Sequence, residues 1–135
     1  MTLTDAEIAA TLRRLADAFN RGDYEGSIEI AHPEIELVRA WEKSSLYGTE
    51  ALQAWLKPDA FENQSLELLD LTISGGKVLV NQRFRARGAG SGMDVEVDSW
   101  AVWTLDEAGL ATKLELFLRH EENEAREAAG LAASA

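Results

Sequence analysis

The chain has 135 residues, a formal net charge of -11 and no cysteine. That charge argues against nucleic acids and anionic membranes as partners, and the lack of cysteine excludes disulfides and thiol chemistry. No apolar run approaches the roughly 18 residues of a membrane helix, and the first residues lack a signal-peptide pattern, so we expect a soluble cytoplasmic protein.

The first predicted element is an amphipathic helix that begins after Thr4. Thr4 and Glu7 have the spacing of a capping box, in which each side chain bonds the other residue's backbone. Apolar residues then follow at helical spacing, namely Ile8, Leu12, Leu15 and Phe19. We expect this stripe to face the core and the helix to end near residues 20–23.

The next segments are short. We expect a second helix that starts at Asp23 and is ended by Pro33. After it the pattern predicts a strand over 34–41, a loop over 42–48, and a third helix over 49–56 that Thr49 caps and that closes before Pro58.

From Ser65 onward the pattern predicts strands. Four are expected, over 65–74, 77–87, 93–105 and 110–120, with hairpin connections at 75–76, 88–92 and 106–109, and then a short polar helix over 122–131. Helices followed by an antiparallel meander indicate an α+β fold, a cone-shaped curved antiparallel sheet wrapped on the N-terminal helices. We expect residues 1–130 to form this single domain with one open pocket and residues 131–135 to be a frayed tail.

Charge fixes the register of two strands. Three arginines alternate before the GAGSG link and three acids alternate after it, which predicts the pairs Arg83–Asp98, Arg85–Glu96 and Arg87–Asp94. This arginine–carboxylate ladder is then a structural feature and not a phosphate site. A four-residue loop at 106–109 would next pair Ala101 with Leu114 and Ser99 with Leu116.

The ladder marks the outer face of the sheet, which also carries two large aromatic residues. We expect a homodimer through this face, with contacts from Arg83, Arg85, Trp100, Glu115 and Phe117. The alternative is a solvated face with two isolated aromatic residues.

The inner face is apolar apart from Gln82 and Ser99, which lie side by side. They either orient a ligand's carbonyl or hydroxyl group or hydrogen-bond each other or a water molecule. Arg39 is two residues after Leu37 and so lies on the same face of the predicted strand. It either binds a carboxylate or enolate oxygen or pairs with a helix acid such as Asp17. The predicted pocket comprises Leu15, Phe19, Arg39, Trp41, Trp55, Gln82, Phe84, Ser99, Trp103 and Leu116.

The two histidines do not indicate a metal site. His32 is expected to cap a helix end, and the run from His120 to Glu122 is better explained by acids at a helix N-terminus than by metal ligands. We therefore expect no metal and no cofactor.

Several stretches together resemble a known family. The order of "LADAFNRGDYEGSIEIAHPEIELV", "YGTEALQAWL", "GSGMDVEVDSWAVWTLDEAGLATKLELFL" and "EAREAAGL" is similar to the SnoaL-like branch of the nuclear-transport-factor-2-like superfamily, which includes ketosteroid isomerases and polyketide cyclases. The resemblance covers nearly the whole chain. It implies a cone with a pocket open at one end and, in most members, a homodimer.

The family's catalytic groups do not carry over. When this chain is aligned with the isomerases, Arg39 takes the position of their catalytic base, Leu15 that of their tyrosine and Ala101 that of their second acid. An isomerase mechanism is therefore not expected. The inner positions also lack the acid or histidine of a cyclase and the Asp–Arg–Asp set of limonene-epoxide-hydrolase-type sites. We expect the cone to bind a small hydrophobic molecule, carbonyl- or carboxylate-bearing, and leave catalysis open. The alternative is a dimerisation module whose cone is filled by its own side chains.

Overall fold

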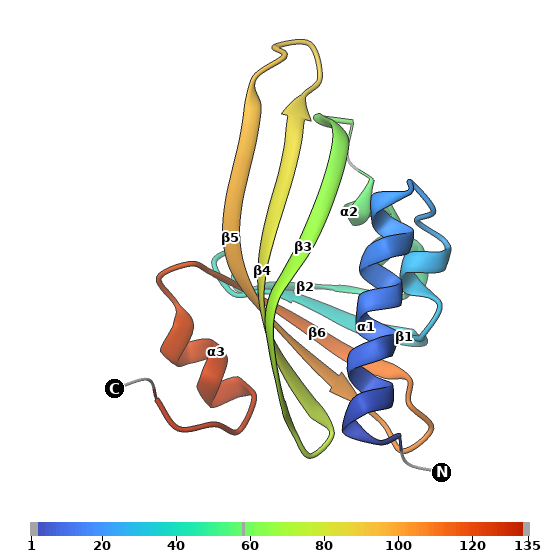
Figure 1. Cartoon of the computed structure of the whole chain (residues 1–135), viewed down its shortest axis with the longest axis vertical. Coiled ribbons are helices and arrows are strands. Elements are labelled where there is room, and N and C mark those ends of the chain that lie inside the picture. Colours follow the sequence, from blue (N-terminus) through green and yellow to red (C-terminus); the bar gives the residue numbers. More distant parts are fainter. Residues whose placement is uncertain (1–2, 58, 134–135) are drawn as a thin grey trace.

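The computed structural model describes residues 3–57 and 59–133, which form a curved six-stranded sheet and three α-helices (Figure 1). The elements are α1 (Asp5–Asn20), a 3-10 turn (Gly26–Ile28), β1 (Ala31–Arg39), β2 (Ser44–Tyr47), α2 (Thr49–Leu56), β3 (Phe61–Ser74), β4 (Lys77–Gly88), β5 (Asp94–Leu105), β6 (Ala111–Leu118) and α3 (Glu122–Ala128). In the described part of the chain, no helix is long and apolar enough to cross a membrane.

The sheet has the strand order β2-β1-β6-β5-β4-β3. Every neighbouring pair is antiparallel except β1 and β6, which run parallel. Strands β3, β4 and β5 extend upward as a long arm, while β1, β2 and β6 cross below them and α1 lies beside β3 (Figure 1). The predicted α+β fold is confirmed, with this one parallel pair added.

The capping box predicted at the start of α1 is present. Glu7 N–H donates to Thr4 Oγ1 over 3.2 Å, and Thr4 N–H donates to Glu7 Oε1 over 3.0 Å. At the other end, Asn20 holds the helix to the edge strand β3. Its side-chain amide donates to the Leu66 carbonyl over 3.0 Å, and its side-chain oxygen accepts from the Leu66 N–H over 2.6 Å. Asn20 thus bonds Leu66 as a neighbouring strand would.

The predicted helix that starts at Asp23 and is ended by Pro33 is wrong. The helix expected from Asp23 is only the 3-10 turn, because the Asp23 carboxylate accepts from the Gly26 N–H and closes a tight turn. Pro33 lies inside β1, in a stretch not paired with β6, where a missing N–H costs little.

The expected loop over 42–48 contains β2, which pairs with β1 from Glu36 to Arg39. Gly48, not Thr49, is the N-cap of α2, and its φ of 92° suits glycine. Pro58 lies outside the described residues, as do residues 134–135 of the predicted tail. Leu131, which the tail prediction also includes, packs against the apolar cluster beneath α3.

The predicted register of β4 and β5 is confirmed, and that of β5 and β6 is wrong by two residues. Arg83 faces Asp98 and Gln82 faces Ser99, as expected. However, Ser99 pairs with Leu118 and Ala101 with Leu116, because the ladder has an irregularity after Thr104. A shift of two leaves every side chain on its predicted face.

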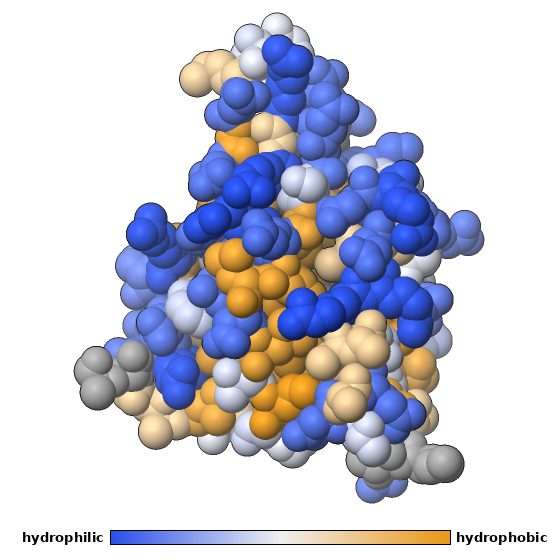
Figure 2. All heavy atoms as spheres, viewed as in Figure 1, coloured by the Kyte–Doolittle hydropathy of each residue, from blue (hydrophilic) through white to orange (hydrophobic). Residues whose placement is uncertain are grey.

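The sheet packs apolar side chains on both faces. The inner cluster joins α1 to the sheet and includes Leu12, Leu15, Leu37, Val80 and Leu116. Apolar side chains also reach the surface along β3 beside α1, bordered by hydrophilic residues (Figure 2).

The outer cluster lies under α3. It contains Leu79, Val102 and Phe117 from the sheet and Ala125 and Ala129 from the helix end of the chain. The prediction that Phe117 is an exposed aromatic is therefore wrong, since its own chain covers it and leaves it 7% exposed.

Candidate functional site

The burial of the inner face becomes uneven beyond Gln82 and Ser99. Below this pair, Val80 and Ala101 are each 1% exposed. Above it on β5, Val97 is 47% exposed although it also faces inward. The polar pair therefore lies between the buried core and one exposed apolar residue, Val97; Phe84 opposite Val97 is part-buried, and Ala86 beyond it is 7% exposed.

Gln82 and Ser99 contact each other weakly. Gln82 Nε2 donates to Ser99 Oγ over 3.4 Å, which is long for a hydrogen bond, and both residues are part-buried. This is the mutual bond that the sequence analysis offered as the alternative to a ligand contact. A better acceptor or donor in this position would compete with it readily.

Arg39 ends β1 on the inner face, opposite Leu116 of β6 and Ser44 of β2. Its Nη1 lies 2.9 Å from Glu42 Oε2, and its Nη2 donates to Ser44 Oγ over 3.1 Å. Its Nε is buried and has no hydrogen-bond partner among the described residues. The acid beside Arg39 is therefore Glu42 from the following turn and not Asp17, the helix acid considered from the sequence.

The other predicted pocket residues divide by depth. Leu15, Phe19 and Leu116 are fully buried in the core, whereas Trp55, Phe84 and Trp103 are part-buried. The Phe84 ring meets the Phe61 ring edge-on at 5.6 Å. Trp41 lies in the turn after β1 and is 41% exposed, because β1 ends before the alternation reaches it.

Three residues outside the predicted pocket lie near this region. Phe61 contacts Phe84, and Tyr24 meets the Phe19 ring edge-on at 5.5 Å. Gln64 Nε2 joins α2 to the turn after α1, since it donates to the Leu56 carbonyl over 3.1 Å and lies 3.3 Å from the Tyr24 hydroxyl. Neither Phe61 nor Gln64 belonged to a predicted strand, so no pattern placed them on the inner face.

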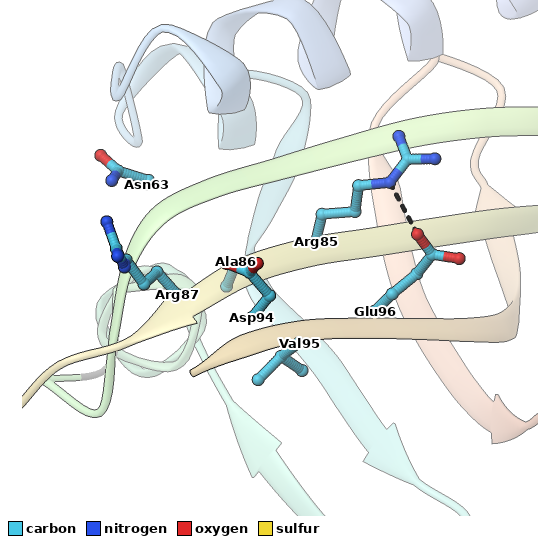
Figure 3. Close-up of a pocket in the computed structure, with 7 residues that line it drawn as sticks. All are labelled: Asn63, Arg85, Ala86, Arg87, Asp94, Val95 and Glu96. Atoms are coloured by element: carbon cyan, nitrogen blue, oxygen red, sulfur yellow. Dashed lines mark hydrogen bonds and ion pairs between the residues drawn. The ribbon is translucent and has the colours of Figure 1, made fainter. Parts of the chain in front are cut away.

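A hollow of about 440 Å³ lies at the arm, next to the ladder (Figure 3). It is lined by Asn63, Arg85, Ala86, Arg87, Asp94, Val95 and Glu96. Arg85 Nε donates to Glu96 over 2.9 Å. Arg87 does not bond its predicted partner Asp94; its Nε donates to the Gly92 carbonyl over 3.2 Å, because the turn brings that oxygen closer. A smaller hollow of about 360 Å³ lies beside α3.

The strongest pair of the ladder is Arg83 with Asp98. Arg83 Nε and Nη2 donate to the two Asp98 oxygens over 2.8 and 3.1 Å. This hydrogen bonding lowers the pKa of Asp98 and raises the pKa of Arg83. The charges of the pair cancel locally, in keeping with the structural role predicted for the ladder.

The histidines are not gathered with other possible ligands. His32 lies in β1, where its Nδ1 accepts from the Glu34 N–H over 3.0 Å, so it does not cap a helix as predicted. Glu121 accepts from the Leu118 N–H over 2.7 Å. Within residues 3–57 and 59–133, no three His, Cys, Asp or Glu side chains come together as a metal site would require.

Comparison with known proteins identifies the family. Among solved structures, the chain is similar to SalBIII, an epoxide hydrolase/cyclase-like enzyme in pyran ring formation in polyether salinomycin (16% identity, TM-score 0.75, covering 84% of this chain and 92% of that one). It is also similar to a protein described as a SnoaL-like polyketide cyclase from Jannaschia sp. CCS1 (19% identity, TM-score 0.74, covering 89% of this chain and 92% of that one). A third similar structure is TerC co-crystallised with polyporic acid (18% identity, TM-score 0.71, covering 84% of this chain and 92% of that one).

These identities are low, so the solved structures establish the shared fold alone. No curated protein matches the chain. The model of the SnoaL-like domain matches residues 12–114, which is most of the chain. The chain therefore belongs to the SnoaL-like domain family.

Proposed function

We propose that this protein binds a small, flat, mainly apolar molecule with one carbonyl or carboxylate group on the outer half of the inner face. One observation carries this proposal. The exposed Val97 and the part-buried Phe84 opposite it lie directly beside a weakly bonded polar pair, Gln82 and Ser99. An apolar ligand ring would cover Val97 and Phe84, and the ligand's oxygen would hydrogen-bond to Gln82 or Ser99.

The surroundings support this ligand chemistry. Arg39, in the row of Leu116 and Ala101, offers a buried Nε donor that has no partner among the described residues. TerC, which has the same fold, was co-crystallised with polyporic acid. The inner half of the cone is filled by the protein's own side chains, so the ligand would occupy only the open half.

Arg39 is the group best suited to polarise a bound carbonyl. The strand positions that share the inner face are apolar from Val78 to Val80 and from Leu114 to Leu118, and they carry no carboxylate or histidine. Proton abstraction by a protein base is therefore not part of the proposal. A guanidinium can instead stabilise negative charge on a ligand oxygen.

The test is an NMR titration with 2-naphthamide, a flat apolar probe with one carbonyl. We expect amide and side-chain shifts at Gln82, Phe84, Val97 and Ser99, and we expect the Val97→Glu variant to lose them, because a carboxylate there would have to be desolvated by the ring. The matched control is Glu96→Gln, which alters the neighbouring position on the opposite face. Shifts limited to the ladder, or an unchanged response in Val97→Glu, would count against the proposal.

A second candidate function is self-association through the outer face. The structure leaves the ladder uncovered by α3, and the Arg85 and Glu96 side chains are about half exposed. A second copy would contact Arg83, Arg85, Trp100 and Glu115, without Phe117. Reversing charge with Arg83→Glu should then yield monomers by sedimentation velocity, and an unchanged oligomeric state would exclude this surface.

A further inference from the structure

Glu42 neutralises Arg39 from the turn that joins β1 to β2. The Nη1–Oε2 distance is 2.9 Å, and the two residues are three apart in the chain. We infer that Glu42 is an internal substitute for a ligand carboxylate, so that the cone selects acidic ligands that displace Glu42 from Arg39. This inference rests on the proposed function and adds to it the acidic class of ligand.

The two partners differ in how firmly the fold holds them. The Arg39 side chain is 18% exposed, and its Nη2 is bonded to Ser44 on the neighbouring strand. The Glu42 side chain is 48% exposed, and among the described residues its carboxylate bonds Arg39 alone. Glu42 can therefore move into water while Arg39 stays in place.

The backbone of the turn brings Glu42 back over the guanidinium. Glu42 N–H donates to the Arg39 carbonyl over 3.0 Å, and Lys43 follows with a φ of 50°. A lysine in this left-handed region is uncommon and carries a cost. The turn thus adopts a costly conformation at Lys43, directly after the residue whose carboxylate lies beside Arg39.

One donor of Arg39 is still unused. The buried Nε has no partner among the described residues, whereas Nη1 and Nη2 are engaged by Glu42 and Ser44. A ligand carboxylate would displace Glu42 by accepting from Nη1, the donor that Glu42 now holds, and Glu42 would then move into water.

The experiment compares two probes with the same ring, 2-naphthoate and 2-naphthamide. Their affinities are measured calorimetrically for the wild type and for Glu42→Gln, Arg39→Gln and the double variant. Glu34→Gln is the matched control, since Glu34 is exposed on β1, the strand that carries Arg39, and its replacement changes the net charge by as much as Glu42→Gln does. Circular dichroism confirms that each variant is folded.

We expect Glu42→Gln to bind 2-naphthoate about two- to fivefold more tightly, because an exposed ion pair no longer competes. Binding of 2-naphthamide should not change, and the gain should vanish in the Arg39→Gln background. If 2-naphthamide binds but Glu42→Gln and Glu34→Gln bind 2-naphthoate with equal affinity, the role of Glu42 as a substitute for a ligand carboxylate is overturned and the proposed function stands. If neither probe binds any variant, both are overturned.

Discussion

Asn20 offers a sharp test of how α1 is held against the sheet. Asn20→Ala removes both side-chain hydrogen bonds to Leu66, at 2.6 and 3.0 Å. A typical net contribution is about 0.5–1.5 kcal/mol for each bond, and Asn20 is exposed, so we expect a loss of about 1–2 kcal/mol in the free energy of unfolding. For a domain of this size that corresponds to a fall in Tm of roughly 3–8 °C.

The assay is urea unfolding followed by circular dichroism, with two companion variants. Asn20→Asp keeps an acceptor for the Leu66 N–H but sets a carboxylate oxygen against the Leu66 carbonyl, so it should be no more stable than Asn20→Ala. Gln53→Ala is the control, because Gln53 is exposed on α2 and its side chain makes no hydrogen bond with the described residues. If Asn20→Ala is as stable as Gln53→Ala, the edge-holding role of Asn20 is wrong.

Three further changes test the rest of the fold. Phe117→Ala should destabilise by about 3–5 kcal/mol in urea unfolding, because it leaves a cavity beneath α3; a loss under 1 kcal/mol would mean that α3 does not cover this ring. Because the pKa of Asp98 is lowered in the folded protein, its carboxylate stabilises the fold at pH values above the ordinary pKa of 3.8, and this contribution is lost as the pH falls through the lowered pKa. Asp98→Asn should therefore reduce the difference between the urea midpoints measured at pH 7 and at about pH 3. Gly109→Ala should lower the Tm, since Gly109 has a φ of 85° and an added Cβ would lie 2.9 Å from Leu3; an unchanged Tm would show that the turn relaxes freely.

The faces of the sheet could be predicted because alternation and charge constrain them together. The three arginines and three acids around the GAGSG link allow one pairing of β4 and β5 that keeps charge out of the core, and that pairing is observed. No comparable charge pattern links β5 to β6. There the loop length decided the prediction, and the irregularity after Thr104 shifted the pairing by two.

Features that depend on tertiary contact could not be predicted. The strand β2 is only four residues long, and it forms because β1 offers a free edge between Glu36 and Arg39. The burial of Phe117 depends on α3 folding back over the outer face, which no periodicity indicates.

The candidate site was predicted in part for the same reason. The parity of β1 and the register of β4 with β5 placed Arg39, Gln82 and Ser99 on the inner face. The contact of Arg39 with Glu42 depends on a turn whose shape the sequence pattern does not specify. Trp41 lies in that same turn, so the alternation of β1 did not extend to it.

The most direct test of the binding site is a crystal structure of the protein soaked with 2-naphthoate. We expect electron density for the naphthalene ring against Phe84 and Val97, with the carboxylate turned toward Arg39 or the Gln82–Ser99 pair. Density for the probe only on the outer face, or an inner face closed by the rings of Phe61 and Phe84 with no probe bound, would contradict it.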